Sequence, residues 1–160
     1  MEKALKGVLR LSKWCSFVGE ITLTCMMVLT VSDVILRSFK RPILGTYEII
    51  AFSGAVAIGF SVPITSWMRG HVNVDILTST LSPRVRDALN IGTRCLVIAL
   101  FLIMSWRLIS YGMNLHRVRE VSMTLQLPFY PVAYGLGLAF LVQCLVLCCD
   151  ILKIARGTYE

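Results

Sequence analysis

Residues 67–83, W-M-R-G-H-V-N-V-D-I-L-T-S-T-L-S-P, are the longest polar interruption between the apolar segments of this chain. They follow Ile49–Met68, a run of twenty residues without an ionisable group. At about 1.5 Å per residue, such a run crosses the ~30 Å of a hydrocarbon core as a helix. Ser82 and Pro83 fit the N-cap and first position of a following helix. The stretch therefore predicts the end of one membrane helix and the start of another.

The interior of this stretch has a helical pattern of its own. Its apolar residues recur at three- and four-residue spacing, with polar residues between them: Val72, Ile76, Leu77 and Leu81. This spacing predicts a short amphipathic helix lying along the membrane interface. A plain polar loop is the alternative.

Four apolar segments divide the rest of the chain. Hydrophobic residues make up 56% of the 160 residues and charged residues 16%, and the mean hydropathy is +0.74. A soluble domain of this size is less apolar. We predict an all-α integral membrane protein with a single membrane domain, residues 1–160, and four transmembrane helices at about residues 14–36, 46–68, 88–111 and 129–152.

The net charge of +7 does not indicate nucleic-acid binding, because the basic residues cluster at the ends of apolar segments. Ten of them fall on the side of the termini and of residues 67–83, and six on the side of the other two connections. The positive-inside rule then places both termini in the cytoplasm.

A few charged and small residues are candidates for helix contacts. Arg37 and Glu48 flank the short connection between the first two spans and predict an ion pair, and Asp33 lies four residues before Arg37, within reach. Arg69, His71 and Asp75 predict a locking contact at the exit of the second span, with a solvated helix end as the alternative. Close approach of another helix is predicted along a stripe of small residues on the second span: Ala51, Ala55 and Gly59.

Chemistry of an enzymatic kind has no support in the sequence. The six cysteines show no metal-ligand or C-x-x-C spacing, and no two histidines are placed to bind haem across the membrane. A thiol oxidase that uses Cys144 and Cys148 is disfavoured for the same reason. We expect no cofactor, no metal and no catalytic or substrate-binding residue. The stronger alternative is an autonomous four-helix exporter of the small multidrug type, with Glu20 as its coupling acid.

The order of features resembles a known family, the DctQ-like small membrane subunit of tripartite ATP-independent periplasmic (TRAP) transporters. Arg37 follows the first span, Glu48-Ile49 opens the second, and Leu81-Ser82-Pro83 precedes the third, as in that family. The closest likeness is R-G-H-V-N-V-D-I-L at residues 69–77, which lacks one residue of the usual R-G-x-H pattern. The polar connector at residues 122–128 and Pro131 complete the resemblance.

The resemblance implies a scaffold subunit of the bacterial inner membrane. Its partners would be a large multi-span permease subunit, a periplasmic substrate-binding protein and membrane lipids. Sodium would drive the import of an organic acid, with the substrate and sodium sites on the large subunit.

Overall fold

The computed structural model of the chain consists of four long helices and describes residues 2–68 and 83–155. They are α1 (Glu2–Ser38), α2 (Thr46–Trp67), α4 (Pro83–Val118) and α5 (Tyr130–Ala155). Each is long and apolar enough to cross a membrane. The prediction of an all-helical protein with four such helices is confirmed. The predicted amphipathic helix lies outside the described residues.

Two of the helices are longer than the spans that the sequence predicts. α1 begins at Glu2 instead of near Trp14, because Glu2–Lys13 is rich in leucine, lysine and other good helix formers and contains no proline, so that its one glycine, Gly7, does not interrupt the helix. α4 likewise continues to Val118. Both helices are therefore longer than the hydrocarbon core is thick, and they must tilt or project into the headgroup layers.

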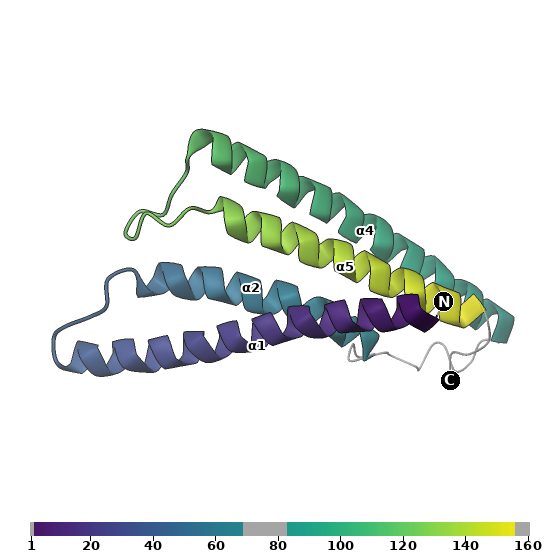
Figure 1. The fold of residues 1–160 in the computed structure, drawn as a ribbon, viewed down its shortest axis with the longest axis horizontal. Coiled ribbons are helices and arrows are strands. Elements are labelled where there is room, and N and C mark those ends of the chain that lie inside the picture. Colours follow the sequence, from purple (N-terminus) through teal and green to yellow (C-terminus); the bar gives the residue numbers. More distant parts are fainter. Residues whose placement is uncertain (1, 69–82, 156–160) are drawn as a thin grey trace.

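The helices form two antiparallel hairpins, α1 with α2 and α4 with α5, which meet along α2 and α5. Figure 1 shows the resulting order, in which α1 and α4 lie on the outside of the pair. The hairpins converge toward the end where α1 begins and α5 ends, called here the terminal end. They diverge toward the connections at residues 39–45 and 119–129, called here the connector end.

Within each hairpin, small residues allow the backbones to approach. A Cβ atom on Gly19 of α1 would lie 3.1 Å from the carbonyl oxygen of Ala57 on α2. In the second hairpin, the hydroxyl of Ser105 on α4 donates to the carbonyl of Gly137 on α5 at 2.7 Å. Because lipid tails are as apolar as the side chains, close packing and such hydrogen bonds hold membrane helices together.

Contacts between the hairpins repeat every seven residues along the parallel pair α2 and α5. From the connector end inward, the rings of Phe52 and Phe129 lie 5.0 Å apart, Leu136 fills the space beside Gly59, and the amide of Gln143 donates to the hydroxyl of Ser66 at 2.6 Å. A seven-residue repeat is typical of helices packed side by side as in a coiled coil. We call this row of contacts the α2–α5 seam.

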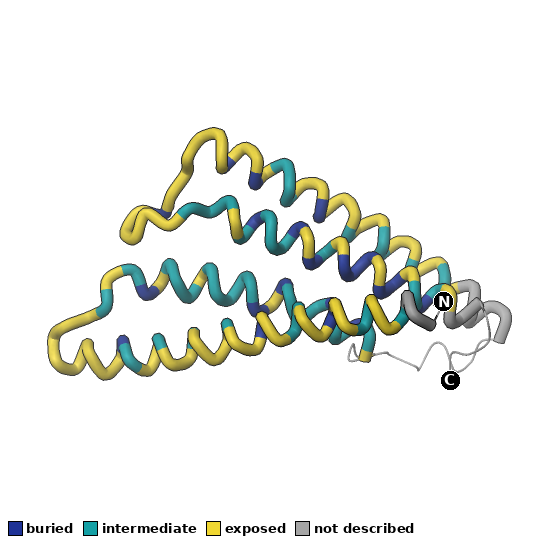
Figure 2. Tube along the Cα trace, in the orientation of Figure 1, coloured by how far each residue is buried: buried dark blue, intermediate teal, exposed yellow. Residues whose placement is uncertain are grey.

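Burial follows the same order. Figure 2 shows buried positions along much of α5, whereas α1 and α4 are exposed over most of their surface. In the most apolar stretch of α5, 39% of the residues are buried inside the chain, compared with 11% in α1 and in α4. The chain thus has a seam at its centre and two outer helices with large apolar surfaces.

Candidate functional site

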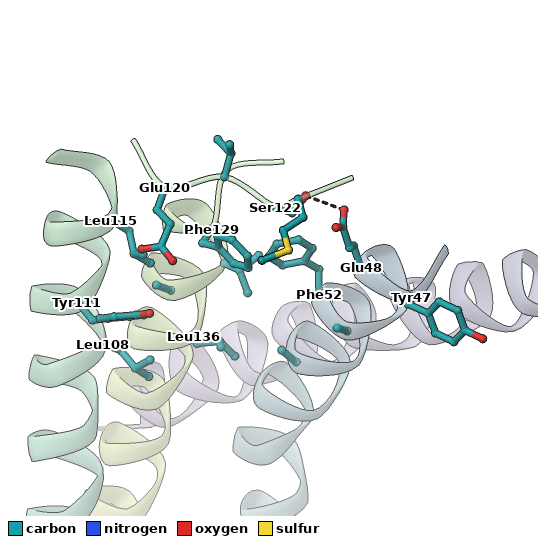
Figure 3. Close-up of a pocket in the computed structure, with 16 residues that line it drawn as sticks. Tyr47, Glu48, Phe52, Leu108, Tyr111, Leu115, Glu120, Ser122, Phe129 and Leu136 are labelled. Carbon is teal, nitrogen blue, oxygen red and sulfur yellow. Dashed lines mark hydrogen bonds between the residues drawn. The ribbon is translucent and has the colours of Figure 1, made fainter. Parts of the chain in front are cut away.

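The carboxylate of Glu48 joins the two hairpins at the connector end. It accepts hydrogen bonds from the hydroxyl of Ser122 at 2.7 Å and from the backbone N–H groups of Thr124 at 2.8 Å and Leu125 at 3.0 Å. Figure 3 shows the bond to Ser122. Hydrogen bonds to an ionised group are about twice as strong as neutral ones. Three donors therefore satisfy this carboxylate without any cation.

The connector that supplies these donors is itself folded. The N–H of Ser122 donates to the carbonyl of Leu127 at 2.9 Å, and the N–H of Leu127 donates to the Ser122 hydroxyl at 3.1 Å. Ser122 is buried, whereas Met123 beside it is fully exposed. The connector is thus a compact loop with Ser122 at its centre and an apolar side chain at its tip.

Gly45 completes the junction from the other connection. It precedes α2 with a φ of 79°, a conformation that favours glycine, and the side chain of Leu125 occupies the space where a Cβ atom would be. The two connections therefore touch each other. The positive φ and the lack of space beside Leu125 each require glycine at this position.

Arg37 has different partners from those that the sequence predicts. Its Nε donates to Asp33 at 2.9 Å, and its guanidinium lies over the ring of Tyr47, 5.3 Å from the centroid. Asp33 also accepts a hydrogen bond from the N–H of Ile43 at 2.9 Å. The contact of Asp33 with Arg37 is confirmed, and Asp33 holds both the end of α1 and the first connection.

The predicted ion pair of Arg37 with Glu48 is wrong in this structure. Asp33 is one helical turn from Arg37 and satisfies it within α1. Glu48 is turned toward the other hairpin, where donors of the connector surround its carboxylate. The two residues belong to separate networks that lie side by side at the connector end.

A cavity of about 610 Å³ opens beside Glu48, between α2, α4, α5 and the connector. Tyr111 and Glu120 point toward it in Figure 3, whereas Tyr47 points away. Most of its lining is apolar: Ala51, Phe52, Ala55, Leu108, Leu115, Val121, Met123, Phe129, Val132, Ala133 and Leu136, with Tyr47, Glu48, Tyr111, Glu120 and Ser122. An apolar concavity at a helix junction is suited to apolar groups.

The small-residue stripe on α2 is divided between this cavity and the seam. Gly59 is buried and the side chain of Leu136 fills the space beside it, while the predicted approach of another helix along the stripe stays a prediction. Ala51 and Ala55 line the cavity instead.

Chemical groups for catalysis are not gathered in the described part of the chain. Residues 2–68 and 83–155 contain no group of three histidine, cysteine or acidic side chains that could hold a metal ion. All six cysteines are free; Cys144 is buried and Cys148 is exposed. The thiol of Cys144 lies 3.8 Å from the carbonyl oxygen of Ile98. No disulfide joins any two of these six cysteines.

The model of one protein family matches residues 26–157, most of the chain. This family is described as the DctQ component of tripartite ATP-independent periplasmic transporters. The chain belongs to the DctQ family. It is therefore the small membrane component of a TRAP transporter, as the order of motifs predicts. No curated protein matches it significantly.

Membership in the DctQ family favours a transporter component over the autonomous exporter and the thiol oxidase. The family motif at Arg69, His71 and Asp75 lies outside the described residues, so the predicted locking contact stays a prediction. Sequence reasoning missed Ser122 and Thr124 as partners of Glu48. Their signal is weak: two hydroxyl residues in a connector of mixed polarity, 74 and 76 positions from the carboxylate.

Proposed function

We propose that this DctQ chain is a scaffold subunit that holds a large permease subunit in a sodium-coupled TRAP transporter. The observation that carries the proposal is the outward apolar surface of α1 and α4: in the most apolar stretch of each, only 11% of the residues are buried inside the chain. Membership in the DctQ family indicates the class of partner, because the family is a component of tripartite transporters.

The substrate and sodium sites belong, in this proposal, to the large subunit. The described residues offer no cluster of acidic or histidine side chains for an ion, and Glu48 is satisfied by donors of the same chain. The substrate is an organic acid that a periplasmic binding protein delivers. We propose no enzymatic activity.

The connector end faces the periplasm and the terminal end the cytoplasm of a bacterial inner membrane. The ten-to-six distribution of basic residues supports this orientation. The exposed tip at Met123 then lies on the side of the binding protein. A single cysteine at Lys40 should react with an impermeant thiol reagent added to intact cells, and one at Lys3 should not. Labelling in the reverse order would refute the orientation.

Copurification tests the scaffold role. The tagged chain, coexpressed with the large permease subunit of its own transporter, should recover that subunit in a stable ratio in mild detergent. A helical membrane protein of similar size and charge serves as the control bait. Recovery no greater than with this control would contradict the proposal.

A further inference from the structure

Glu20 lies near the middle of the membrane. Its neighbour Gly19 faces the centre of α2, where an added Cβ atom would lie 3.1 Å from the carbonyl oxygen of Ala57 and 2.9 Å from the hydroxyl of Ser61. α2 spans Thr46–Trp67, and its length of about 33 Å matches the hydrocarbon core. Because Ala57 is at the midpoint of α2, the carboxyl group of Glu20 is about half-way across the bilayer.

Glu20 lies on an exposed flank of α1, about 100° around the helix axis from Gly19, which faces α2. Glu20 is exposed, and the hydroxyl of Ser16 on the same helix donates a hydrogen bond to its carboxylate at 2.8 Å. The exposed hydroxyls of α1 are satisfied differently, because each donates to the carbonyl four residues earlier: Thr22, Thr24, Thr30 and Ser32. Among the described residues of α1, Glu20 is thus an acid at membrane depth with one local hydrogen-bond donor, the hydroxyl of Ser16.

Lipid is a poor environment for this group. Acyl chains offer no hydrogen-bond donor, and headgroups lie about 15 Å from the midplane. Acidic residues inside membrane spans therefore almost always face protein or a water-filled cavity, and they pair with a donor there. The group that contacts the carboxyl group of Glu20 in the membrane must therefore come from outside the described part of this chain.

We propose that Glu20 docks against a membrane helix of the large permease subunit that carries an arginine or lysine at the same depth. The proposal rests on the scaffold role and adds to it one contact and one face of α1. A cation on the partner is favoured because one hydroxyl leaves most acceptor sites of a carboxylate unused, and a guanidinium or ammonium group supplies several donors at once.

The helix period defines the face involved. At about 100° per residue, Thr24, Met27 and Val31 share the side of α1 on which Glu20 lies. Met27 and Val31 are exposed large apolar residues. We call these four residues the Glu20 flank. One acid among apolar and small polar residues suits a partner helix that packs in lipid and forms a single polar contact. Val18 and Cys25 are also exposed but lie on the opposite side of α1.

Site-specific photocrosslinking in the assembled transporter tests the face. A benzophenone amino acid at Thr24 or Met27 should form an adduct with the large subunit, and the same group at Val18 or Cys25 should not. Adducts to lipid alone at Thr24 and Met27, or adducts between two copies of this chain, would overturn the proposal. If the unmodified chain recovers the large subunit but the flank forms no adduct with it, this proposal fails while the scaffold role stands.

Substitution tests the charge. Glu20→Leu should reduce recovery of the large subunit between about threefold and about twentyfold, since single polar contacts between membrane helices have effects of this size. Glu20→Gln, which keeps an acceptor, should reduce it less, and Cys25→Ala should leave it unchanged. Glu20→Leu makes α1 more apolar, so a lipid-facing residue would give equal or greater recovery; that result would refute the contact.

Discussion

The inner and outer helices of this chain all contain an apolar stretch long enough to cross a membrane, but they differ in how much of it the chain itself covers. α2 and α5 meet along a seam of small, aromatic and polar contacts that repeat every seven residues. α1 and α4 each contact one inner helix extensively and leave the rest of their surface open. We therefore expect substitutions in the seam to change the stability of the chain and, under the proposed scaffold role, the outer helices to carry its contacts with the large subunit.

Crowding the seam should give the largest loss of stability. Gly59→Val places new methyl groups where the side chain of Leu136 lies, and overpacking in a close-packed interior costs about 1–3 kcal/mol. We expect a loss near the upper end, about 3 kcal/mol, measured as the free energy of unfolding in detergent micelles. The matched control is Gly54→Val, since an added Cβ at Gly54 meets no atom within 4 Å. Equal losses for both variants would refute the claim that the α2–α5 seam stabilises the chain.

Removing the junction at the connector end should have the next largest effect. Glu48→Ala leaves the buried hydroxyl of Ser122 and two backbone N–H groups without their acceptor. Hydrogen bonds to charged groups contribute about 1.5–3 kcal/mol each, and water replaces part of this near the interface. We expect the free energy of unfolding to fall by about 2 kcal/mol and proteolysis within residues 119–129 to become faster. Glu120→Ala, at an exposed position, is the control and should change neither quantity.

Changing the polar contact inside the seam should have a smaller effect. Gln143→Leu removes the hydrogen bond to Ser66, but it also removes a buried side-chain oxygen that has no partner among the described residues. The lost hydrogen bond lowers stability and the removal of the unpartnered oxygen raises it, so we expect a change below about 1 kcal/mol in the free energy of unfolding. A loss of 3 kcal/mol would show that Gln143 has a partner beyond those described.

The outer helices should give the smallest effect on the chain alone. Leu96 is 69% exposed on α4, and substitutions on such surfaces usually change stability by less than about 0.5 kcal/mol. Leu96→Ala should therefore leave the unfolding midpoint unchanged. A loss as large as that of Gly59→Val would contradict the division between inner and outer helices.

The sequence predicts where the helices lie along the chain better than it predicts which residues contact one another. Runs without charge, and glycine and proline in the connections, locate four helices because these signals are local. The contact of Asp33 with Arg37 is predictable for the same reason, since one helical turn separates the two residues. The pair of Arg37 and Glu48 fails because proximity in sequence does not determine which way a side chain turns at a helix start.

Contacts between the hairpins have no comparable local signal. Glu48 finds its donors more than 70 residues away, and all faces of these helices are apolar, so periodicity does not show which face meets α5. Of the stripe of Ala51, Ala55 and Gly59, Gly59 contacts the side chain of Leu136, and the predicted approach of another helix along the stripe stays a prediction. The depth of Glu20 likewise follows only from the contact of Gly19 with α2.

Sodium-driven uptake in proteoliposomes tests the central claim most directly. Vesicles would contain this chain alone, the large subunit alone, or both, with the periplasmic binding protein and its labelled organic acid outside. The account predicts uptake that depends on an inward sodium gradient only when both membrane subunits are present. Gradient-dependent transport by this chain alone, or full uptake by the large subunit without it, would contradict the scaffold role.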